Sequence, residues 1–325
     1  MTRDRILVTG ANGFIGQHLC AHLAATGRKL TACIRPNAMM PTLDNLRIAY
    51  VRDLASYENW PELLADVDAV IHLAARVHVM RDRSIDPLAE FRKVNVAATG
   101  VVAEQSSQSG VRRLLYVSSI KVNGEATPKG EFRADDAPAY VDPYGQSKWE
   151  AEQKIQEIGA ASGMEWLVVR PTLVYGPGVR GNFLSLMGYV QRGLPLPFGE
   201  VPNRRSLVNV YNLVDLLAKA IDHPAAAGQV FLVKDPEDLS TGELIRRIAG
   251  ALHRTPRLLS IPTPLLVRAA KLLGQEQVVR RLFGSLVVNT EKTADLLGWQ
   301  APVSLDCALA RTCSWFETSA AGKGA

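Results

Sequence analysis

The sequence has few cysteines and no long uninterrupted hydrophobic segment. Its four cysteines, Cys20, Cys33, Cys307 and Cys313, form neither a CxxC pair nor a metal-ligand spacing. We therefore expect reduced, mostly buried thiols and no metal site. No apolar run reaches the roughly 18 residues that a membrane-spanning helix needs, and the N-terminal residues lack the architecture of a signal peptide. These absences predict a cytoplasmic protein without an integral membrane segment.

An excess of charge of one sign is also absent. Lysine and arginine number 37 against 32 aspartates and glutamates, which gives a net charge of +5. The arginines are scattered, and no basic tract or basic patch interleaved with aromatic residues occurs. The pattern argues against nucleic acid as a partner and favours an anionic small molecule. A chain of 325 residues with 47% hydrophobic residues is typical of one large globular α/β domain or of two domains.

The N-terminal region contains a glycine-rich turn between a predicted strand and a predicted helix. Residues 5–9 form a branched, apolar strand, residues 10–16 have the pattern G-x-x-G-x-x-G, and residues 17–26 form a helix that ends at Gly27. Glycines let backbone N–H groups approach a pyrophosphate, and a helix N-terminus adds partial positive charge. The turn therefore predicts a dinucleotide site that includes Gly10, Asn12, Gly13, Phe14 and Ile15.

The next two predicted strands end in residues suited to the adenosine half of a dinucleotide. Residues 29–34 are followed by Arg35, an arginine where an acidic residue would select NAD. Arg35 therefore favours NADP(H), although the same residue could simply face solvent. Residues 46–51 are followed by Asp53 and Leu54, and the Asp53 carboxylate could accept a hydrogen bond from the adenine amine.

Strands and helices continue to alternate through the first half of the chain. Residues 68–75 form a fourth strand that runs into small residues, and we interpret its His72 as a packed core histidine. Residues 87–109 form a long helix with Asn95 in its middle, and residues 113–117 form a fifth strand followed by Ser118 and Ser119. This alternation predicts a Rossmann-type, doubly wound parallel sheet that binds ligands at the carboxyl ends of its strands.

Tyr144 and Lys148 begin a predicted helix over residues 144–158, directly after Asp142 and Pro143. Residues four apart share a helix face, so the two side chains lie one above the other. An ammonium group beside a phenol lowers the pKa of the phenol and makes it a usable acid or base. The alternative is a surface helix that carries both residues by chance.

Together these residues resemble the extended short-chain dehydrogenase/reductases, in the NAD-dependent epimerase/dehydratase branch that acts on nucleotide sugars. The resemblance is carried by the motifs already described and by residues 170–177 and 297–302 in the second half. Residues 76–80, 118–128 and 147–152 more particularly resemble the UDP-N-acetylquinovosamine dehydrogenase group. The resemblance implies a smaller C-terminal α/β domain for the substrate, NADP(H) or NAD(H) as cofactor, and a homodimer built from residues 87–109 and 144–158.

The resemblance also implies roles for individual residues. Tyr144 is the acid/base on the sugar oxygen, Ser119 hydrogen-bonds the same oxygen, and Lys148 holds the nicotinamide ribose. A ketone that becomes an alkoxide needs such donors. Asn95 would bridge its helix and the active-site loop. Further cofactor contacts are expected from Leu73, Ala74, Ala75, Asn95, Tyr144, Lys148 and Pro171.

The substrate half is less clearly marked. The loop over residues 120–124 departs from the commoner pattern, with Lys121, interpreted as solvated, and with Asn123 as a sugar contact. Asn182 and Phe198 are expected near the nucleotide sugar, and Arg205 is expected to pair with its diphosphate. The alternative for Arg205 is a solvated surface turn. Arg280 and Arg281 are candidates for a second diphosphate contact, beyond a predicted amphipathic helix over residues 264–273.

The predicted domain division is discontinuous. Residues 1–171 form the dinucleotide-binding domain, to which a segment near 206–235 returns. Residues 172–205 and 236–317 form the substrate domain, and residues 318–325 form a loose tail.

The leading functional hypothesis is reduction of a UDP-4-keto-6-deoxy-N-acetylhexosamine at C4, in bacterial surface-polysaccharide synthesis such as that of lipopolysaccharide O-antigen. The alternative is a UDP-hexose or UDP-N-acetylhexosamine 4-epimerase with tightly bound NAD. A non-catalytic NAD(P)-binding regulator is a third possibility. A dehydratase is disfavoured because residues 118–121 lack the acidic pair of that branch.

Overall fold

The computed structural model describes residues 4–77, 84, 86–127, 130–199, 201–262, 265, 268 and 283–321. Its strands are β1 (Arg5–Thr9), β2 (Lys29–Ile34), β3 (Leu46–Tyr50), β4 (Val67–His72), β5 (Arg113–Val117), β6 (Glu165–Pro171), β7 (Leu173–Tyr175), β8 (Arg205–Asn209), β9 (Gln229–Val233) and β10 (Asp238–Leu239). Its α-helices are α1 (Phe14–Ala25), α2 (Trp60–Leu64), α3 (Pro87–Arg92), α4 (Ala98–Gln108), α5 (Pro143–Ser162), α6 (Gly181–Gln191), α7 (Val210–Ala220), α8 (Thr241–Ala251), α11 (Glu291–Leu297) and α12 (Leu305–Ala321). Short turns of other helix types are the π-helix η1 (Lys93–Ala97) and the 3-10 helices η2 (Ile120–Val122) and η3 (Pro224–Ala226).

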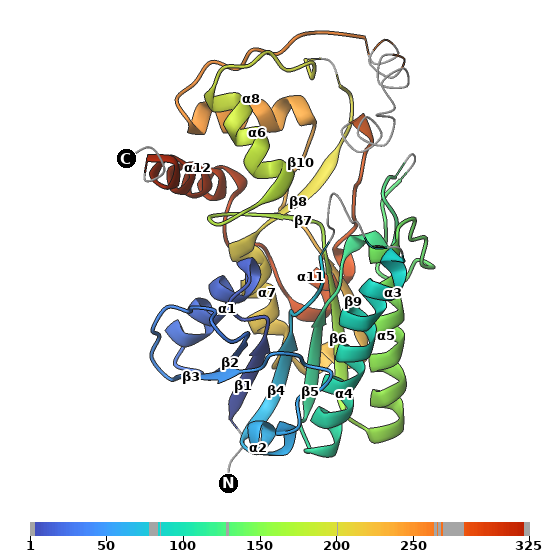
Figure 1. Ribbon diagram of the computed structural model, residues 1–325. Coiled ribbons are helices and arrows are strands. Elements are labelled where there is room, and N and C mark those ends of the chain that lie inside the picture. Colours follow the sequence, from blue (N-terminus) through green and yellow to red (C-terminus); the bar gives the residue numbers. More distant parts are fainter. Residues whose placement is uncertain are drawn as a thin grey trace.

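Seven parallel strands form the main sheet, in the order β3-β2-β1-β4-β5-β6-β9. The chain runs outward from β1 to one edge, returns to β4 and then runs to the other edge. The carboxyl ends of β1 and β4 therefore lie where the strand order reverses, which is where ligands bind in open α/β sheets. The prediction of a doubly wound parallel sheet is confirmed, and the smaller unit lies beyond the carboxyl ends of the strands (Figure 1).

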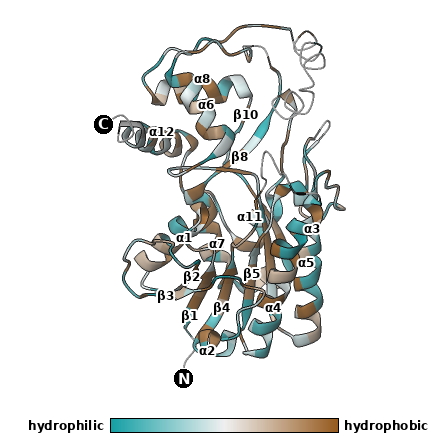
Figure 2. Cartoon of the chain, in the orientation of Figure 1, coloured by the Kyte–Doolittle hydropathy of each residue, from teal (hydrophilic) through white to brown (hydrophobic). Residues whose placement is uncertain are grey.

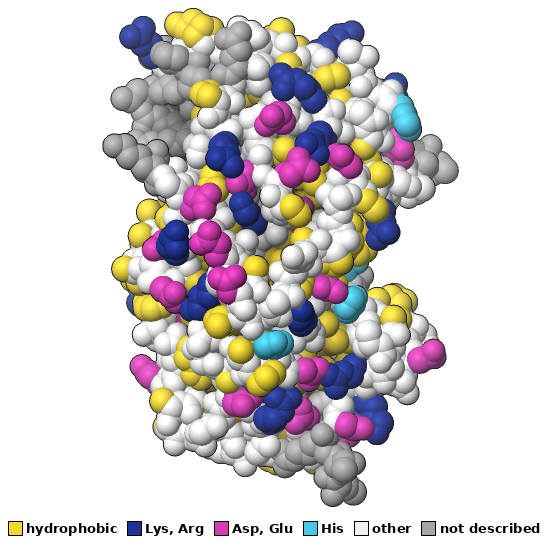
Figure 3. Space-filling view, turned by 180° about the vertical axis from the view of Figure 1, so that it is seen from behind, with side chains coloured by type: hydrophobic (Ala, Val, Ile, Leu, Met, Phe, Trp, Pro, Cys, Tyr) yellow, Lys and Arg dark blue, Asp and Glu magenta, His cyan; other side chains and the backbone are white. Residues whose placement is uncertain are grey.

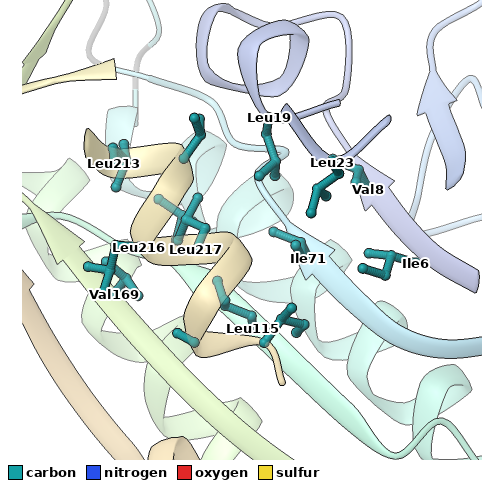
Figure 4. Packing of buried hydrophobic residues seen from close by; sticks show 14 of the residues in the cluster. Ile6, Val8, Leu19, Leu23, Ile71, Leu115, Val169, Leu213, Leu216 and Leu217 are labelled. Carbon is teal, nitrogen blue, oxygen red and sulfur yellow. The ribbon is translucent and has the colours of Figure 1, made fainter. Parts of the chain in front are cut away.

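Helices cover both faces of the main sheet because both faces are apolar, as Figure 2 shows by the brown colour of the central strands. On one face α1 and α7 pack side by side on the sheet, and Leu19 and Leu23 of α1 belong to the same buried cluster as Leu213 and Leu217 of α7 and Ile71 of β4 (Figure 4). On the other face α2, α4 and α5 bury a second cluster. Truncating one such core leucine to alanine costs about 2–5 kcal/mol of stability.

The smaller unit contains the three-stranded sheet β10-β8-β7 and helices α6, α8 and α12. The predicted returning segment is divided between the two units. Strand β8 pairs with β7 and β10 in the smaller sheet, whereas α7 packs beside α1 and β9 pairs with β6 in the main sheet. The predicted loose tail also begins later than expected, because α12 continues to Ala321. Most of the predicted helix over residues 264–273, including Lys271, and both Arg280 and Arg281 lie outside the described residues.

The cysteines are free, as predicted. Cys20, Cys33 and Cys313 are buried and Cys307 is exposed. Burial raises the pKa of each buried thiol to about 12, so these three cysteines are protonated core residues. No helix in the described part of the chain is long and apolar enough to cross a membrane. On the face shown in Figure 3, basic and acidic side chains are interspersed.

Candidate active site

The turn between β1 and α1 packs closely against the segment that follows β4. Gly10 has a φ of +66°, and a Cβ added to it would lie 2.9 Å from the Cα and the N of Ala74. The turn is closed by a hydrogen bond from Gly13 N to Gly10 O at 2.9 Å, and Gly13 lies exposed at the start of α1. The unpaired N–H groups of a helix start attract phosphate oxygens. The turn therefore fits the pyrophosphate of a dinucleotide.

The residues predicted to contact a dinucleotide lie on or close to this turn. Asn12, Phe14 and Ile15 are half-buried on the turn itself. Leu73, Ala74 and Ala75 follow β4 and are also half-buried next to Gly10. Phe14 additionally packs against Gly178 of the loop before α6, at 3.5 Å from the position of an added Cβ. The turn thus connects the main sheet with the smaller unit.

His72, the last residue of β4, connects β1 and α4 through hydrogen bonds to Thr9 and Thr99. Thr9 Oγ1 accepts hydrogen bonds from the backbone N of Leu73 and of Ala74, each at 3.2 Å. Its own proton therefore points to His72 Nδ1 at 2.6 Å, and His72 Nε2 donates to Thr99 Oγ1 at 2.9 Å. Burial, together with the smaller effect of the Lys148 charge, lowers the pKa of His72 to about 3. His72 is thus the neutral core histidine that the sequence predicted.

Two predicted adenosine contacts lie at the carboxyl ends of neighbouring strands. Arg35 is exposed directly after β2. Asp53 is exposed after β3, where its Oδ1 accepts a hydrogen bond from Ala55 N at 3.0 Å, and Leu54 beside it is half-buried. Since β2 and β3 are adjacent and parallel, these side chains share one edge of the sheet.

Helix α5 carries Tyr144 and Lys148 on one face. Asp142 caps the helix by accepting a hydrogen bond from Gly145 N at 2.7 Å, and Pro143 occupies the first turn. Tyr144 is half-buried and packs edge-on against Phe91 of α3, with ring centroids 5.9 Å apart. Ser119 begins η2 and forms a hydrogen bond with Tyr144. The structure therefore brings Ser119 and Tyr144 together at the end of β5.

Lys148 lies deeper than the sequence suggested. Its side chain is 1% exposed, and its ammonium group donates to the backbone O of Val117 at 2.8 Å, 4.1 Å above the Tyr116 ring. Burial lowers the pKa of Lys148 to about 7, whereas the charge of Glu152 raises it. At neutral pH the amine is close to its titration point, so it can hold or lose a proton.

The predicted lowering of the Tyr144 pKa is wrong. Burial raises the pKa of Tyr144 to about 12; the hydrogen bond with Ser119 opposes this shift, and the charge of Asp142 adds to it. The ammonium group of Lys148 donates a hydrogen bond to Val117 O at the end of β5, and its charge is not among the causes of the shift in the Tyr144 pKa. Tyr144 is therefore a protonated phenol here, ready to donate a hydrogen bond or a proton.

Asn95 occupies a special position in the helix, as its predicted bridging role requires. It lies in η1, the π turn that joins α3 and α4, and π turns are frequent at functional sites. Its Oδ1 accepts from Arg76 N at 2.8 Å, and its Nδ2 donates to Arg76 O at 3.1 Å and to Ser147 Oγ at 3.0 Å. Asn95 thus joins the loop after β4 to the helix of Tyr144.

A buried ion pair behind α5 was missed by the sequence reasoning. Arg170 on β6 donates two hydrogen bonds to Glu152 on α5, at 3.0 and 2.6 Å, and both side chains are at most 2% exposed. The available signals were an arginine at the end of an apolar strand and a glutamate one helical turn beyond Lys148. The pair fixes α5 against β6, next to the buried Pro171, a predicted cofactor contact.

Asn123 belongs to this buried network and does not face a substrate. Its Oδ1 accepts from Arg170 Nη1 at 3.0 Å, its Nδ2 donates to Arg133 O at 2.8 Å, and it is 1% exposed. The predicted sugar contact is therefore corrected to a structural role, because the amide already has protein partners on both of its polar atoms.

The other predicted substrate residues lie on the smaller unit (Figure 1). Asn182 is exposed in the first turn of α6, and Phe198 is buried beside Phe283, with ring centroids 5.6 Å apart. Arg205 is half-buried on β8 and donates to Gly284 O at 2.9 Å, and burial lowers its pKa. Its placement in a strand excludes the alternative of a solvated turn.

The arrangement suits proton and hydride chemistry on an alcohol or ketone. A bound nicotinamide cofactor would supply or accept the hydride. Tyr144 can move a proton at the reacting oxygen and Ser119 can hydrogen-bond that oxygen, while Lys148 lies buried next to them at the end of β5. Among the described residues, no cluster of three or more His, Cys, Asp or Glu side chains could hold a metal ion.

Comparison with known proteins supports this assignment. Residues 6–233 match the model of the NAD dependent epimerase/dehydratase family. A protein of Vibrio cholerae named UDP-glucose 4-epimerase is 42% identical over 313 residues, which cover 96% of this chain and 95% of that protein. A protein of Pseudomonas aeruginosa named GDP-6-deoxy-D-mannose reductase is 27% identical, and the match covers 97% of this chain and 98% of that protein.

A solved structure gives the same result. The structure of MoeE5 in complex with UDP-glucuronic acid and NAD has a TM-score of 0.78 and 28% identity, and the match covers 97% of this chain and 99% of that one. The glycine turn, the placement of Ser119, Tyr144 and Lys148, and the match over most of the sequence lead to one conclusion. The chain belongs to the NAD-dependent epimerase/dehydratase family of extended short-chain dehydrogenases/reductases and is an enzyme that uses a nicotinamide dinucleotide.

Proposed function

We propose that the protein interconverts an alcohol and a ketone at C4 of a UDP-sugar, with Tyr144 as the acid/base. The observation that carries this proposal is the pairing of Tyr144 with Ser119 at the carboxyl end of β5, above buried Lys148. In the reducing direction, the Tyr144 hydroxyl gives its proton to the oxygen that gains negative charge at C4, and Ser119 donates a hydrogen bond to it.

A UDP-sugar is the substrate class best supported by the relatives. The Vibrio cholerae relative is named for UDP-glucose, and MoeE5 has been solved with UDP-glucuronic acid and with UDP-glucose. On this chain, Arg205 supplies a positive charge on the smaller unit for a diphosphate. The remaining predicted contacts, Asn182 and Phe198, lie on the same unit.

For the net reaction we favour reduction of a UDP-4-keto-6-deoxy-N-acetylhexosamine. Exposed Arg35 at the end of β2 suits the 2′-phosphate of NADP(H). A reductase consumes its reduced cofactor in every turnover and must exchange it, so a dissociable NADPH fits this outcome. The product would serve bacterial surface-polysaccharide synthesis, such as that of O-antigen.

A 4-epimerase is the second candidate, and the name of the 42% identical relative favours it. An epimerase returns the hydride to the same sugar and needs no added reductant. The purified enzyme should therefore be incubated with UDP-N-acetylglucosamine or UDP-glucose without added cofactor. Formation of the 4-epimer would establish the epimerase and contradict the reductase, whereas NADPH consumption that depends on the 4-keto sugar would do the opposite.

The acid/base role is tested by Tyr144→Phe. Removing the phenolic oxygen deletes the proton donor but leaves the glycine turn intact, so turnover should be lost while dinucleotide affinity changes little. Full activity in this variant would refute the mechanism. If the protein were a non-catalytic regulator, neither the parent protein nor the Tyr144→Phe variant would turn over any UDP-sugar.

We also propose a homodimer formed through the outer faces of the α3–η1–α4 segment and of α5, which lie side by side. Sedimentation of the purified protein should give twice the mass of the chain. A monomer at micromolar concentration would contradict this.

A further inference from the structure

Lys121 lies where the loop of Ser119 meets the helix of Tyr144. It is only 25% exposed, and its ammonium group forms ion pairs with Glu125 at 3.0 Å and with Asp142. The interpretation of Lys121 as a solvated residue is therefore wrong. Partial burial makes such an ion pair stronger and less sensitive to salt than one on the open surface.

The backbone of Lys121 makes the same connection. Its N–H donates to Ser119 Oγ at 3.3 Å, so Lys121 belongs to the turn that Ser119 caps. Its carbonyl oxygen lies against Gly145, where an added Cβ would be only 2.7 Å away. One residue thus contacts the serine turn and the first turn of α5 at once.

Asp142 has two further effects at this point. It caps α5 through Gly145 N, and its negative charge raises the pKa of Tyr144 two residues later. Lys121 places a positive charge directly on this carboxylate. The electrostatic cost of holding an aspartate beside a phenol that must ionise is offset by the lysine.

We propose that Lys121 is a positioning residue, which holds the Ser119 turn against the start of α5 and neutralises Asp142 beside Tyr144. The proposal rests on the acid/base role of Tyr144 in the proposed function. It assigns a purpose to a lysine at which this chain departs from the commoner pattern of its family.

The other charged groups around Tyr144 leave Lys121 a distinct role. The described titratable groups near Tyr144 on the surrounding elements include Tyr116 on β5, Glu125 after η2, Arg92 and Glu90 on α3, and Lys148, Glu150 and Glu152 on α5. Arg92 is paired with Glu150 at 2.6 Å, and Lys148 points to Val117 O. Only Lys121 among these cations forms an ion pair with Asp142 in the described part of the chain.

The test is a set of variants measured by pH profile. Lys121→Met removes a positive charge that lies directly beside the Asp142 carboxylate, so the pH at which the alcohol-oxidising rate rises should move up by roughly one unit, with about tenfold lower activity below it. Lys121→Arg should restore the profile. Adding Asp142→Asn, which keeps a helix cap, should return the profile of Lys121→Met toward that of the parent enzyme.

Lys154→Met is the matched control, because Lys154 on α5 forms an exposed ion pair with Glu104 on α4. Its pH profile should not move. An unchanged profile in Lys121→Met, or additive losses in the double variant, would overturn the proposal.

A second measurement separates this proposal from the proposed reaction. Isotope-labelled tyrosine allows the titration of Tyr144 to be followed by NMR, with the signal assigned by Tyr144→Phe. Lys121→Met should raise this pKa and Asp142→Asn should lower it, whether or not a UDP-sugar is turned over. A pKa of Tyr144 that stays the same in both variants would refute the role of Lys121 independently of the substrate.

Discussion

The ammonium nitrogen of Lys148 lies 2.8 Å from the backbone oxygen of Val117, the last residue of β5. Tyr116 covers the same ammonium group with its ring, 4.1 Å away. A charge in this position has lost most of its water and has gained one carbonyl and one aromatic face in return. Lys148 is therefore held at the strand end at a cost to stability, which is a common feature of functional lysines.

The first prediction concerns the stability of a Lys148→Met variant. The amine has a pKa of 10.5 in its ordinary state and about 7 in the fold. Between these values the unfolded chain binds more protons, so the free energy of unfolding rises with pH across this window. Below about pH 7 the full cost applies to the parent protein, so the stability advantage of Lys148→Met over the parent should be about 3–5 kcal/mol larger there than at high pH.

Urea denaturation of the cofactor-free protein at about pH 6 and about pH 9 measures this effect. The advantage of Lys148→Met over the parent should shrink as pH rises. The exposed Lys154→Met variant should differ from the parent equally at both pH values. A pH-independent difference for Lys148→Met would show that the amine is not buried in its charged form.

The second prediction concerns Gly10. Gly10→Ala forces a Cβ to within 2.9 Å of the Ala74 backbone and strains a φ of +66°. We expect the glycine turn to move and dinucleotide affinity to fall at least tenfold, which is about 1.4 kcal/mol. Gly27→Ala is a matched control, since Gly27 has a φ of +79° but no atom within 4 Å of an added Cβ. That variant should lose about 1 kcal/mol of stability and keep its dinucleotide affinity, as titration calorimetry would show.

The third prediction concerns the buried pair of Arg170 and Glu152. Glu152→Gln leaves a nearly fully buried guanidinium group without its counter-charge, so we expect a loss of about 3–5 kcal/mol. A double replacement, Arg170→Met with Glu152→Leu, should cost less than Glu152→Gln alone because no charge remains buried. Arg92→Ala removes the more exposed pair with Glu150 and should cost less than about 1 kcal/mol. Equal losses in all three variants by denaturant unfolding would contradict this ranking.

The fourth prediction concerns cofactor choice. Arg35 follows β2 and Arg28 precedes it, so the two arginines lie at opposite ends of one strand. Arg35→Asp should reduce the preference for NADPH over NADH by tenfold or more, because the 2′-phosphate would meet a carboxylate. Arg28→Ala, which removes an ion pair with Asp222 at the other end, should leave the preference unchanged. Ratios of kcat/KM for the two cofactors provide the measurement, and an unaltered ratio in Arg35→Asp would place the arginine outside the cofactor site.

Local patterns in the sequence determined the main sheet. Residues 5–9, 29–34 and 113–117 were predicted as strands with the bounds that the structure has. Buried parallel strands are short apolar runs between turn residues, and this signal is contained within each run. The glycine turn was predictable for the same reason, because its backbone geometry depends on the residues at the turn itself.

Only the tertiary structure decided how charges combine. Lys121 and Asp142 are ordinary surface residues in the sequence, and their ion pair arises because η2 and the start of α5 meet. Asn123 was expected at the substrate, but the partners of its amide come from β6 and from the loop at Arg133.

The pKa of Tyr144 shows this division most clearly. The sequence by itself placed Tyr144 and Lys148 on one helix face, since their spacing of four residues follows from helix geometry. The direction in which the pKa of the phenol shifts depends on burial and on the distance to charges. In the folded protein the Lys148 ammonium group donates to the backbone oxygen of Val117, and burial raises the pKa of Tyr144. Sequence spacing determines which side chains share a helix face. The energy of interaction between two charges depends on their distance and on the burial around them, and both are set only when the protein is folded.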